Sequence, residues 1–142
     1  MKCANNRISI NNGKIPIDWN TNINIVKKSL EKFNYLEREF DDFTELFIRE
    51  LDVCFEDIDK IKIKSHLIMH FYDKKLKKWS LTIHPENKEI SLKLYDKYKE
   101  KYKCVSETTN SHKTKIFNGE NDIEKINIEC DSYMLGIDFY LK

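Results

Sequence analysis

The sequence predicts a single α+β domain over residues 1–142, built mainly on an antiparallel β-sheet. Three observations predict this class. Apolar residues alternate with polar ones through most of residues 61–83, an Asn-Gly turn signal lies between isoleucine pairs near the N-terminus, and helical spacing follows that turn. We therefore expect an N-terminal β-hairpin, then one or two packed α-helices, and then most of the sheet. A chain of this length can bury about two-thirds of its unfolded surface around one core.

The N-terminal hairpin is predicted by agreement between its turn and its apolar register. Asn12-Gly13 is a favoured pair for a two-residue type I′ turn. With the turn at this place, Ile10 faces Ile15 and Ile8 faces Ile17. All four isoleucines then lie on one side of the hairpin, as cross-strand packing requires.

A short amphipathic helix is expected next. Thr21 or Asn22 can act as its N-cap, because short polar side chains accept a hydrogen bond from the first free backbone N–H groups. Apolar residues follow at spacings of three, four and three, which is the stripe of one helix face. These residues are Ile23, Val26, Leu30 and Phe33.

Residues 35–55 permit two interpretations. Six residues fall on one narrow helical stripe, namely Leu36, Phe40, Phe43, Phe47, Leu51 and Cys54. Four apolar residues lie off that stripe, however, and residues 51–55 alternate as a strand does. We expect a helix over residues 42–50, with two short strands, 36–40 and 45–55, as the alternative.

The strongest pattern is the central hairpin of residues 60–83. Six side chains point one way along its first limb: Ile61, Ile63, Ser65, Leu67, Met69 and Phe71. The intervening residues point the other way and include Lys62, Lys64, His66 and His70. A polar connection at 73–78 precedes a second limb at 79–83, which ends at Pro85 because proline cannot donate to a ladder. This sheet is predicted to have one buried face and one face open to water.

The remainder of the chain carries weaker signals. Residues 90–94 predict a strand or the start of a helix reaching Tyr102, and residues 106–113 predict a loop. We expect a turn at Asn118-Gly119 and a terminal hairpin of strands around 126–130 and 135–141. Gly136 inside the last strand indicates a bulge or a close backbone neighbour.

Charge is segregated along the chain although the net charge is only +1. Residues 31–59 carry eleven acids, and residues 60–103 carry thirteen lysines and five acids. Either the two segments lie side by side and neutralise each other, or an acidic face is kept for a basic partner. The small net charge argues against a dedicated nucleic-acid-binding protein.

No metal or cofactor is expected. His66 and His70 share a face, but four residues along a strand span about 13 Å, which is too far for one ion. The chain has only three glycines, widely separated, so a glycine-rich phosphate loop is excluded. The four cysteines fit no disulfide framework and no Cys-x-x-Cys pattern, which predicts reduced thiols in the cytoplasm. The sequence contains no apolar run long enough for a membrane span.

The function best supported by these patterns is binding of another protein, as a small inhibitor such as an immunity protein that neutralises a bacterial toxin. Catalytic motifs are absent, whereas charge is segregated. The expected partner-binding residues are Glu37, Glu39, Asp41, Asp42, Glu45, Lys62, Lys64, His66 and His70. Two alternatives stay open. One is a small enzyme with a site of distant histidines and carboxylates, and the other is a nucleic-acid or anionic-surface adaptor using the Lys/Tyr segment 93–103.

Overall fold

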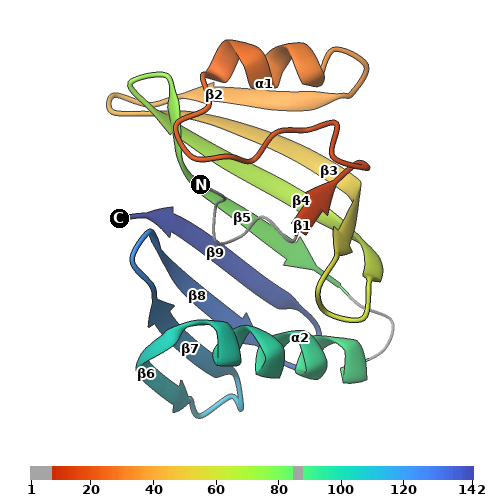
Figure 1. Ribbon diagram of the computed structural model, residues 1–142, viewed down its shortest axis with the longest axis vertical. Helices are drawn as coiled ribbons and strands as arrows, with labels where there is room; N and C mark the ends of the chain where they lie inside the picture. Colours follow the sequence, from red (N-terminus) through yellow and green to blue (C-terminus); the bar gives the residue numbers. More distant parts are fainter. Residues whose placement is uncertain (1–7, 85–87) are drawn as a thin grey trace.

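The computed structural model describes residues 8–84 and 88–142 and confirms the α+β class. In these ranges a single nine-stranded sheet and two helices are found (Figure 1). In chain order they are β1 (Ile8–Ile10), α1 (Ile23–Ser29), β2 (Tyr35–Glu39), β3 (Thr44–Phe55), β4 (Ile61–Tyr72), β5 (Lys75–Ile83), α2 (Lys88–Lys101), β6 (Lys103–Thr109), β7 (Lys115–Glu120), β8 (Glu124–Cys130) and β9 (Leu135–Leu141). Neither of these helices is long and apolar enough to cross a membrane.

The sheet is antiparallel throughout, with strand order β1-β3-β4-β5-β9-β8-β7-β6. Strand β3 is long enough to take two partners on its outer edge. Its C-terminal end pairs with β1 and its N-terminal end pairs with β2. The last strand along the chain, β9, lies between β5 and β8 and joins the two halves of the sheet (Figure 1).

Both helices and the segment before α1 contribute to a core on one face of the sheet. Val26 and Leu30 of the first helical segment are fully buried, and α2 buries Leu94, Tyr95 and Tyr98. Each such burial is worth about 1.5–3 kcal/mol before chain entropy is subtracted. Neither of the two described helices lies on the opposite face, and we call it the open face (Figure 1).

The central hairpin is confirmed as β4 and β5. Side chains of β4 alternate between buried and more exposed positions from Ser65 to Tyr72, as the sequence pattern predicts. Its turn is shorter than expected and consists of Asp73 and Lys74, whose φ values are 52° and 64°. Two left-handed residues in succession match a type I′ turn, whose twist suits the flanking strands. The predicted end at Pro85 lies outside the described residues.

The predicted helix over residues 42–50 is wrong, and the two-strand alternative is the one that forms. The chain folds as β2 and β3 because the residues off the helical stripe, including Leu46, Ile48 and Val53, are nearly fully buried on one face of a strand. A register shift between Ile48 and Leu51, with Glu50 at φ 53°, interrupts the alternation. Because this β-bulge interrupts the alternation within the long strand, the apolar residues of its sequence have a spacing that resembles a helix.

The predicted N-terminal hairpin forms only in its turn. Asn11, Asn12 and Gly13 all have positive φ, so the chain turns through three left-handed residues and leaves the sheet. Ile8 and Ile10 pair with β3, and residues 15–17 form no strand. Ile15 and Ile17 are nevertheless buried in the core.

A capping contact begins α1, and burial of tyrosines accompanies the formation of α2. Asn22 caps α1, and its side chain accepts a hydrogen bond of 2.8 Å from the backbone N–H of Asn24. The strand-or-helix alternative for residues 90–102 is resolved as the helix α2; its Tyr95 and Tyr98, and Tyr102 directly after it, are buried in the core. They are therefore not available for stacking on bases in this structure.

The C-terminal region departs from expectation at three places. The first half of the predicted loop over 106–113 belongs to strand β6 and the second half is a turn, while the predicted turn at Asn118-Gly119 lies inside β7. Gly119 is required by close packing, since a Cβ there would lie 2.6 Å from the ring of Phe117 and 2.8 Å from Cβ of Tyr102. Gly136, by contrast, sits in regular pairing with no contact closer than 3.7 Å. The hairpin joining β8 to β9 is confirmed.

One carboxylate lies within the core. Glu124 is fully buried and accepts hydrogen bonds from Trp19 Nε1, at 2.8 Å, and from the Tyr102 hydroxyl. Burial raises the pKa of Glu124, and the two hydrogen bonds only partly offset this effect. The contacts connect the segment before α1, the end of α2 and β8.

Three ion pairs join the acidic segment 31–59 to the lysine-rich segment 60–103. Lys64 pairs with Asp52 across β4 and β3, at 2.6 Å. On the helical side, Lys93 pairs with Asp59 and Lys101 pairs with Asp57. The lysines of α2 thus face the acidic turn between β3 and β4.

Candidate functional site

One row of side chains crosses the open face from edge to edge. Strand register places directly opposite one another, in order, Ser106, Asn118, Asn127, Asp138, Ser80, Ile68, Phe47 and Leu36. The row is polar from β6 to β5 and apolar from β4 to β2. We call these two parts of the face the polar half and the apolar half.

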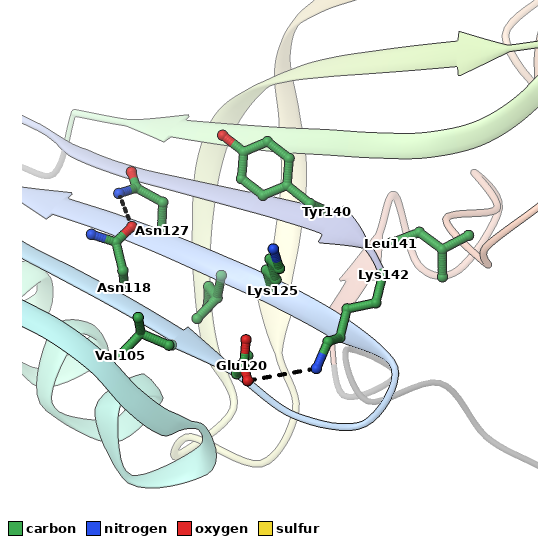
Figure 2. A pocket seen from close by; sticks show the side chains of 10 residues that line it. Val105, Asn118, Glu120, Lys125, Asn127, Tyr140, Leu141 and Lys142 are labelled. Carbon is green, nitrogen blue, oxygen red and sulfur yellow. Dashed lines mark hydrogen bonds and ion pairs between the residues drawn. The ribbon is translucent and has the colours of Figure 1, made fainter.

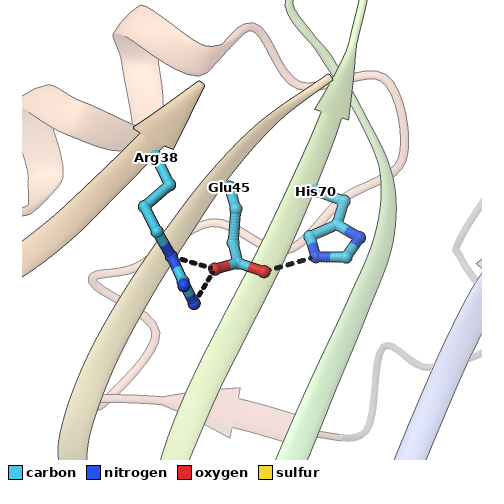
Figure 3. Close-up of polar contacts among 3 residues, drawn as sticks. All are labelled: Arg38, Glu45 and His70. Carbon is cyan, nitrogen blue, oxygen red and sulfur yellow. Dashed lines mark hydrogen bonds and ion pairs between the residues drawn. The ribbon is translucent and has the colours of Figure 1, made fainter. Parts of the chain in front are cut away.

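The apolar half contains a hydrogen-bonded charged triad in the adjacent row. Glu45 on β3 accepts hydrogen bonds from Arg38 on β2 and from His70 on β4 (Figure 3). Its Oε2 lies 3.1 Å from Nε and 2.7 Å from a terminal nitrogen of Arg38, and its Oε1 lies 3.0 Å from His70 Nε2. Both Arg38 nitrogens therefore share one carboxylate oxygen, and the other oxygen accepts from His70. Three neighbouring strands position these groups because each residue is the direct cross-strand partner of the next.

The protonation state of Glu45 follows from these contacts. Partial burial acts to raise the pKa of Glu45, but the hydrogen bonds from His70 and Arg38 outweigh it and leave the pKa below its usual value. The ionised carboxylate can only accept, so His70 must donate its Nε2 proton to Oε1. This fixes the imidazole orientation and directs Nδ1 away from the triad.

Aromatic rings pack around the triad. The ring of Phe43 lies 4.6 Å from that of His70 and 5.1 Å from that of Tyr72, measured between centroids. Phe40 stacks on Phe43 at 4.7 Å. Although they are packed together, Phe40 and Tyr72 remain 48% and 38% exposed, and Leu36 nearby is 59% exposed. Large apolar side chains thus reach solvent on this half of the face.

Acidic residues lie at the tip of the β2–β3 hairpin beside these rings. Glu39, Asp41 and Asp42 are exposed, and within the described parts of the chain they form no ion pair with another side chain. Glu37 and Glu39 alternate with Leu36 and Arg38 and therefore point to the helical side of β2, where Glu37 pairs with Lys27 of α1 at 2.8 Å. The predicted acidic contact residues are therefore divided between the hairpin tip and the opposite side of β2.

The remaining predicted residues lie farther along β4. Lys62 and Lys64 occupy its first half, where Lys64 pairs with Asp52. His66 accepts the backbone N–H of Glu50 at the bulge, at 3.3 Å, and its ring lies 6.0 Å from that of His84. The structure therefore brings Glu45 and His70 together and holds His66 in a separate group.

The histidine group lines only a small pocket. His66, His84 and Glu50 border a space of about 90 Å³, well below the size usual for small-molecule sites. Across residues 8–84 and 88–142, no three histidine, cysteine or acidic side chains are grouped closely enough to hold a metal ion.

The polar half contains a larger depression of about 570 Å³ over β7, β8 and β9 (Figure 2). Asn118 and Asn127 form its floor, and Tyr140 stands at one side beside Lys125. None of these residues was predicted as a site residue; Asn118 was expected only as part of a turn.

The residues of the apolar half were also only partly foreseen. Glu45 and His70 were predicted to contact a partner, but Arg38, Phe43 and Tyr72 were missed. A usable signal was present in the two-strand alternative for residues 36–55. Pairing those strands antiparallel would have placed Arg38 opposite Glu45 and Leu36 opposite Phe47.

Comparison with protein-family models, with curated proteins and with solved structures found no match to this chain. Its function must therefore be argued from its own side chains.

Proposed function

We propose that this protein binds another protein through the apolar half of its open face and acts as an inhibitor in the cytoplasm. An immunity protein that neutralises a toxin is one concrete form of this proposal. The observation that carries it is the exposure of Leu36, Phe40 and Tyr72 around the triad of Arg38, Glu45 and His70. Neither α1 nor α2 covers this half of the face (Figure 1).

The composition of this half suits the centre of a protein interface. Such centres are enriched in aromatic residues and arginine, and a few buried anchors supply most of the binding energy. Phe40, Phe43 and Tyr72 supply aromatic surface that is already stacked, so little side-chain entropy is lost when a partner covers it. The triad satisfies its own charges, which lowers the cost of removing it from water.

The charge at the hairpin tip favours a basic partner. Asp41 and Asp42 lie between Phe40 and Phe43 in the chain, beside the aromatic surface, and Glu39 ends β2. Among the described residues, none of the three carboxylates has an ion-pair partner. Exposed charges of one sign accelerate encounter with a surface of the opposite sign. Toxins that attack nucleic acids present basic surfaces of this kind, which supports the inhibitor form of the proposal.

The test is partner capture with matched variants. The protein is crosslinked in its native host, the partner is identified, and binding is then measured with purified components. Leu36→Asp is expected to abolish capture, because it places a charge in the apolar centre. Ile25→Asp is the matched control, since Ile25 on α1 is equally exposed at 59% but lies away from the open face. Equal loss in both variants, or capture unaffected by Leu36→Asp, would contradict the proposed surface.

A second candidate function is supported by the orientation of His70. The ionised Glu45 holds the imidazole with its proton on Nε2, so that Nδ1 of the neutral ring can accept a proton. A carboxylate orients a histidine base in this manner in many hydrolytic enzymes. Turnover that His70→Gln abolishes would establish this candidate.

A further inference from the structure

We propose that the depression on the polar half is a binding site for a neutral carbohydrate. This site is separate from the apolar half, and none of its residues takes part in the proposed protein contact. Its floor crosses β6, β7 and β8, and Tyr140 of β9 forms a wall (Figure 2). The volume of about 570 Å³ lies within the range usual for small-molecule sites.

The floor is a chain of directed hydrogen bonds. Asn127 Nδ2 donates to Asn118 Oδ1 at 2.8 Å, and Asn118 Nδ2 donates to Ser106 Oγ at 3.1 Å. Ser106 ends this chain of hydrogen bonds outside the lining of the depression, so the groups offered to a ligand are those of the two asparagines. Each amide nitrogen keeps a second hydrogen, and Asn127 Oδ1 keeps its capacity to accept. The hydrogen bonds therefore hold both asparagine side chains in place and leave donors and an acceptor available.

The spacing and position of these groups favour a ligand that binds to the side chains of the sheet and not to its backbone. Adjacent strands place successive residues of the row about 4.8 Å apart. Strands β7, β8 and β9 are each paired on both sides, so their backbone groups are satisfied within the sheet. A peptide gains affinity chiefly from a free strand edge, which these strands lack. A ligand with many hydroxyl groups, each both donor and acceptor, matches the available side chains.

Charges of both signs border the depression. Glu120 lies 3.6 Å from Lys142 and is the direct cross-strand partner of Lys125. An anionic ligand would therefore compete with Glu120 for these lysines, and a cationic ligand would be repelled by them, whereas a neutral ligand meets neither cost. The ring of Tyr140 also borders the depression, and Lys78 Nζ lies over this ring at 4.9 Å from its centroid. A sugar ring can pack its C–H face only on the part of Tyr140 that Lys78 leaves uncovered.

The proposal is tested by NMR titration of the ¹⁵N-labelled full chain with three neutral trisaccharides: maltotriose, cellotriose and triacetylchitotriose. Weak sites with a few hydrogen bonds have dissociation constants of order 1 mM, so each sugar is added to about 10 mM. At least one sugar is expected to shift the side-chain amide signals of Asn118 and Asn127 and the backbone signal of Tyr140.

Two variants and a control identify the site. Asn118→Ala and the isosteric Asn127→Asp are each expected to weaken binding about tenfold, the effect of one lost hydrogen bond. Asn24→Ala, on the exposed side of α1, is expected to leave the affinity unchanged. Circular dichroism checks that each variant is folded.

Three results would overturn the proposal. They are the absence of shifts with all three sugars, shifts that both asparagine variants leave intact, and a stronger response to inorganic phosphate than to any sugar. Each of these results leaves the proposed protein contact standing, because that contact uses the other half of the face.

Discussion

The two halves of the open face stabilise their exposed side chains by different interactions. In the apolar half, a carboxylate accepts hydrogen bonds from a guanidinium group and an imidazole among aromatic rings. In the polar half, uncharged amides and a hydroxyl form a chain of hydrogen bonds. Different strands of one sheet provide the same spacing in both halves, so the difference arises from the side chains alone. A regular sheet can therefore present two surfaces with distinct binding chemistry on one face.

The largest expected effect concerns partner binding by the apolar half. Replacing both Phe40 and Tyr72 by alanine should cost about 2 kcal/mol or more of binding free energy, since aromatic anchors at interface centres are usually hot spots. Calorimetry with the identified partner measures this cost. Replacement of Asn118 and Asn127 by alanine should leave partner affinity within a factor of about two, in keeping with their place in the polar half. If the two double variants lose affinity alike, the two halves are not functionally distinct.

A second prediction concerns stability in the apolar half. Glu45→Ala leaves Arg38 and His70 without their acceptor in a partly buried site, which should reduce the free energy of unfolding by about 1–3 kcal/mol. Urea denaturation gives the value. Glu39→Ala provides the control, because this exposed carboxylate lacks an ion-pair partner in the described chain and should change stability by less than about 0.5 kcal/mol.

The corresponding change in the polar half should be milder. Asn118→Ala removes two neutral hydrogen bonds at a half-exposed site, where water can replace the lost partners. We expect a loss of about 0.5–1.5 kcal/mol in the free energy of unfolding, measured in the same urea experiment. A loss larger than that of Glu45→Ala would show that the amide chain, and not the triad, is the more stabilising network.

The smallest effect is a dependence of stability on pH that originates in the triad. The pKa of Glu45 is lower in the folded protein than its usual value, so its stabilising contribution is fully present above the usual carboxyl pKa. The contribution is lost as the pH falls through the folded pKa. Unfolding midpoints measured between about pH 3 and pH 7 should therefore decline less steeply at the acidic end for Glu45→Gln than for the natural protein. Parallel curves for the two proteins would contradict this assignment.

Buried Glu124 should contribute in the opposite direction. Because the pKa of Glu124 is raised in the folded protein, the folded state binds the carboxyl proton more tightly than the unfolded chain does. The free energy of unfolding therefore decreases as the pH rises above the usual carboxyl pKa. In the same pH series, Glu124→Gln should remove the loss of stability that Glu124 causes as the pH rises, whereas Glu45→Gln removes the loss that Glu45 causes as the pH falls.

Local patterns predicted those elements whose alternation is not interrupted. The hairpin β4–β5 was foreseen because its apolar residues alternate over a long stretch. Strand β3 was assigned to a helix because the bulge at Glu50 displaces the alternation in the middle of the strand. Strand β6 was taken for a loop, since its exposed polar residues carry no apolar pattern and it is defined by pairing with β7.

The candidate site shows the same limit. His70 and Glu45 could be named from the sequence as exposed polar residues on or near the central hairpin. Their contact depends on the register between β3 and β4, which residues far apart in the chain determine. The cluster of Phe43 with Tyr72 and the chain from Asn127 to Ser106 likewise arise from pairing across strands. Single-sequence periodicity contains no information on such partners.

The central place of β9 has a consequence for protein synthesis. Ribosomes complete β5 long before they produce residues 135–141, and until then the inner edge of β5 has no partner. That edge belongs to a strand bearing Trp79, Leu81 and Ile83, and exposed apolar edges of this kind recruit other chains. We expect the nascent chain to depend on chaperone protection during translation of residues 84–134, the interval before β9 closes the sheet.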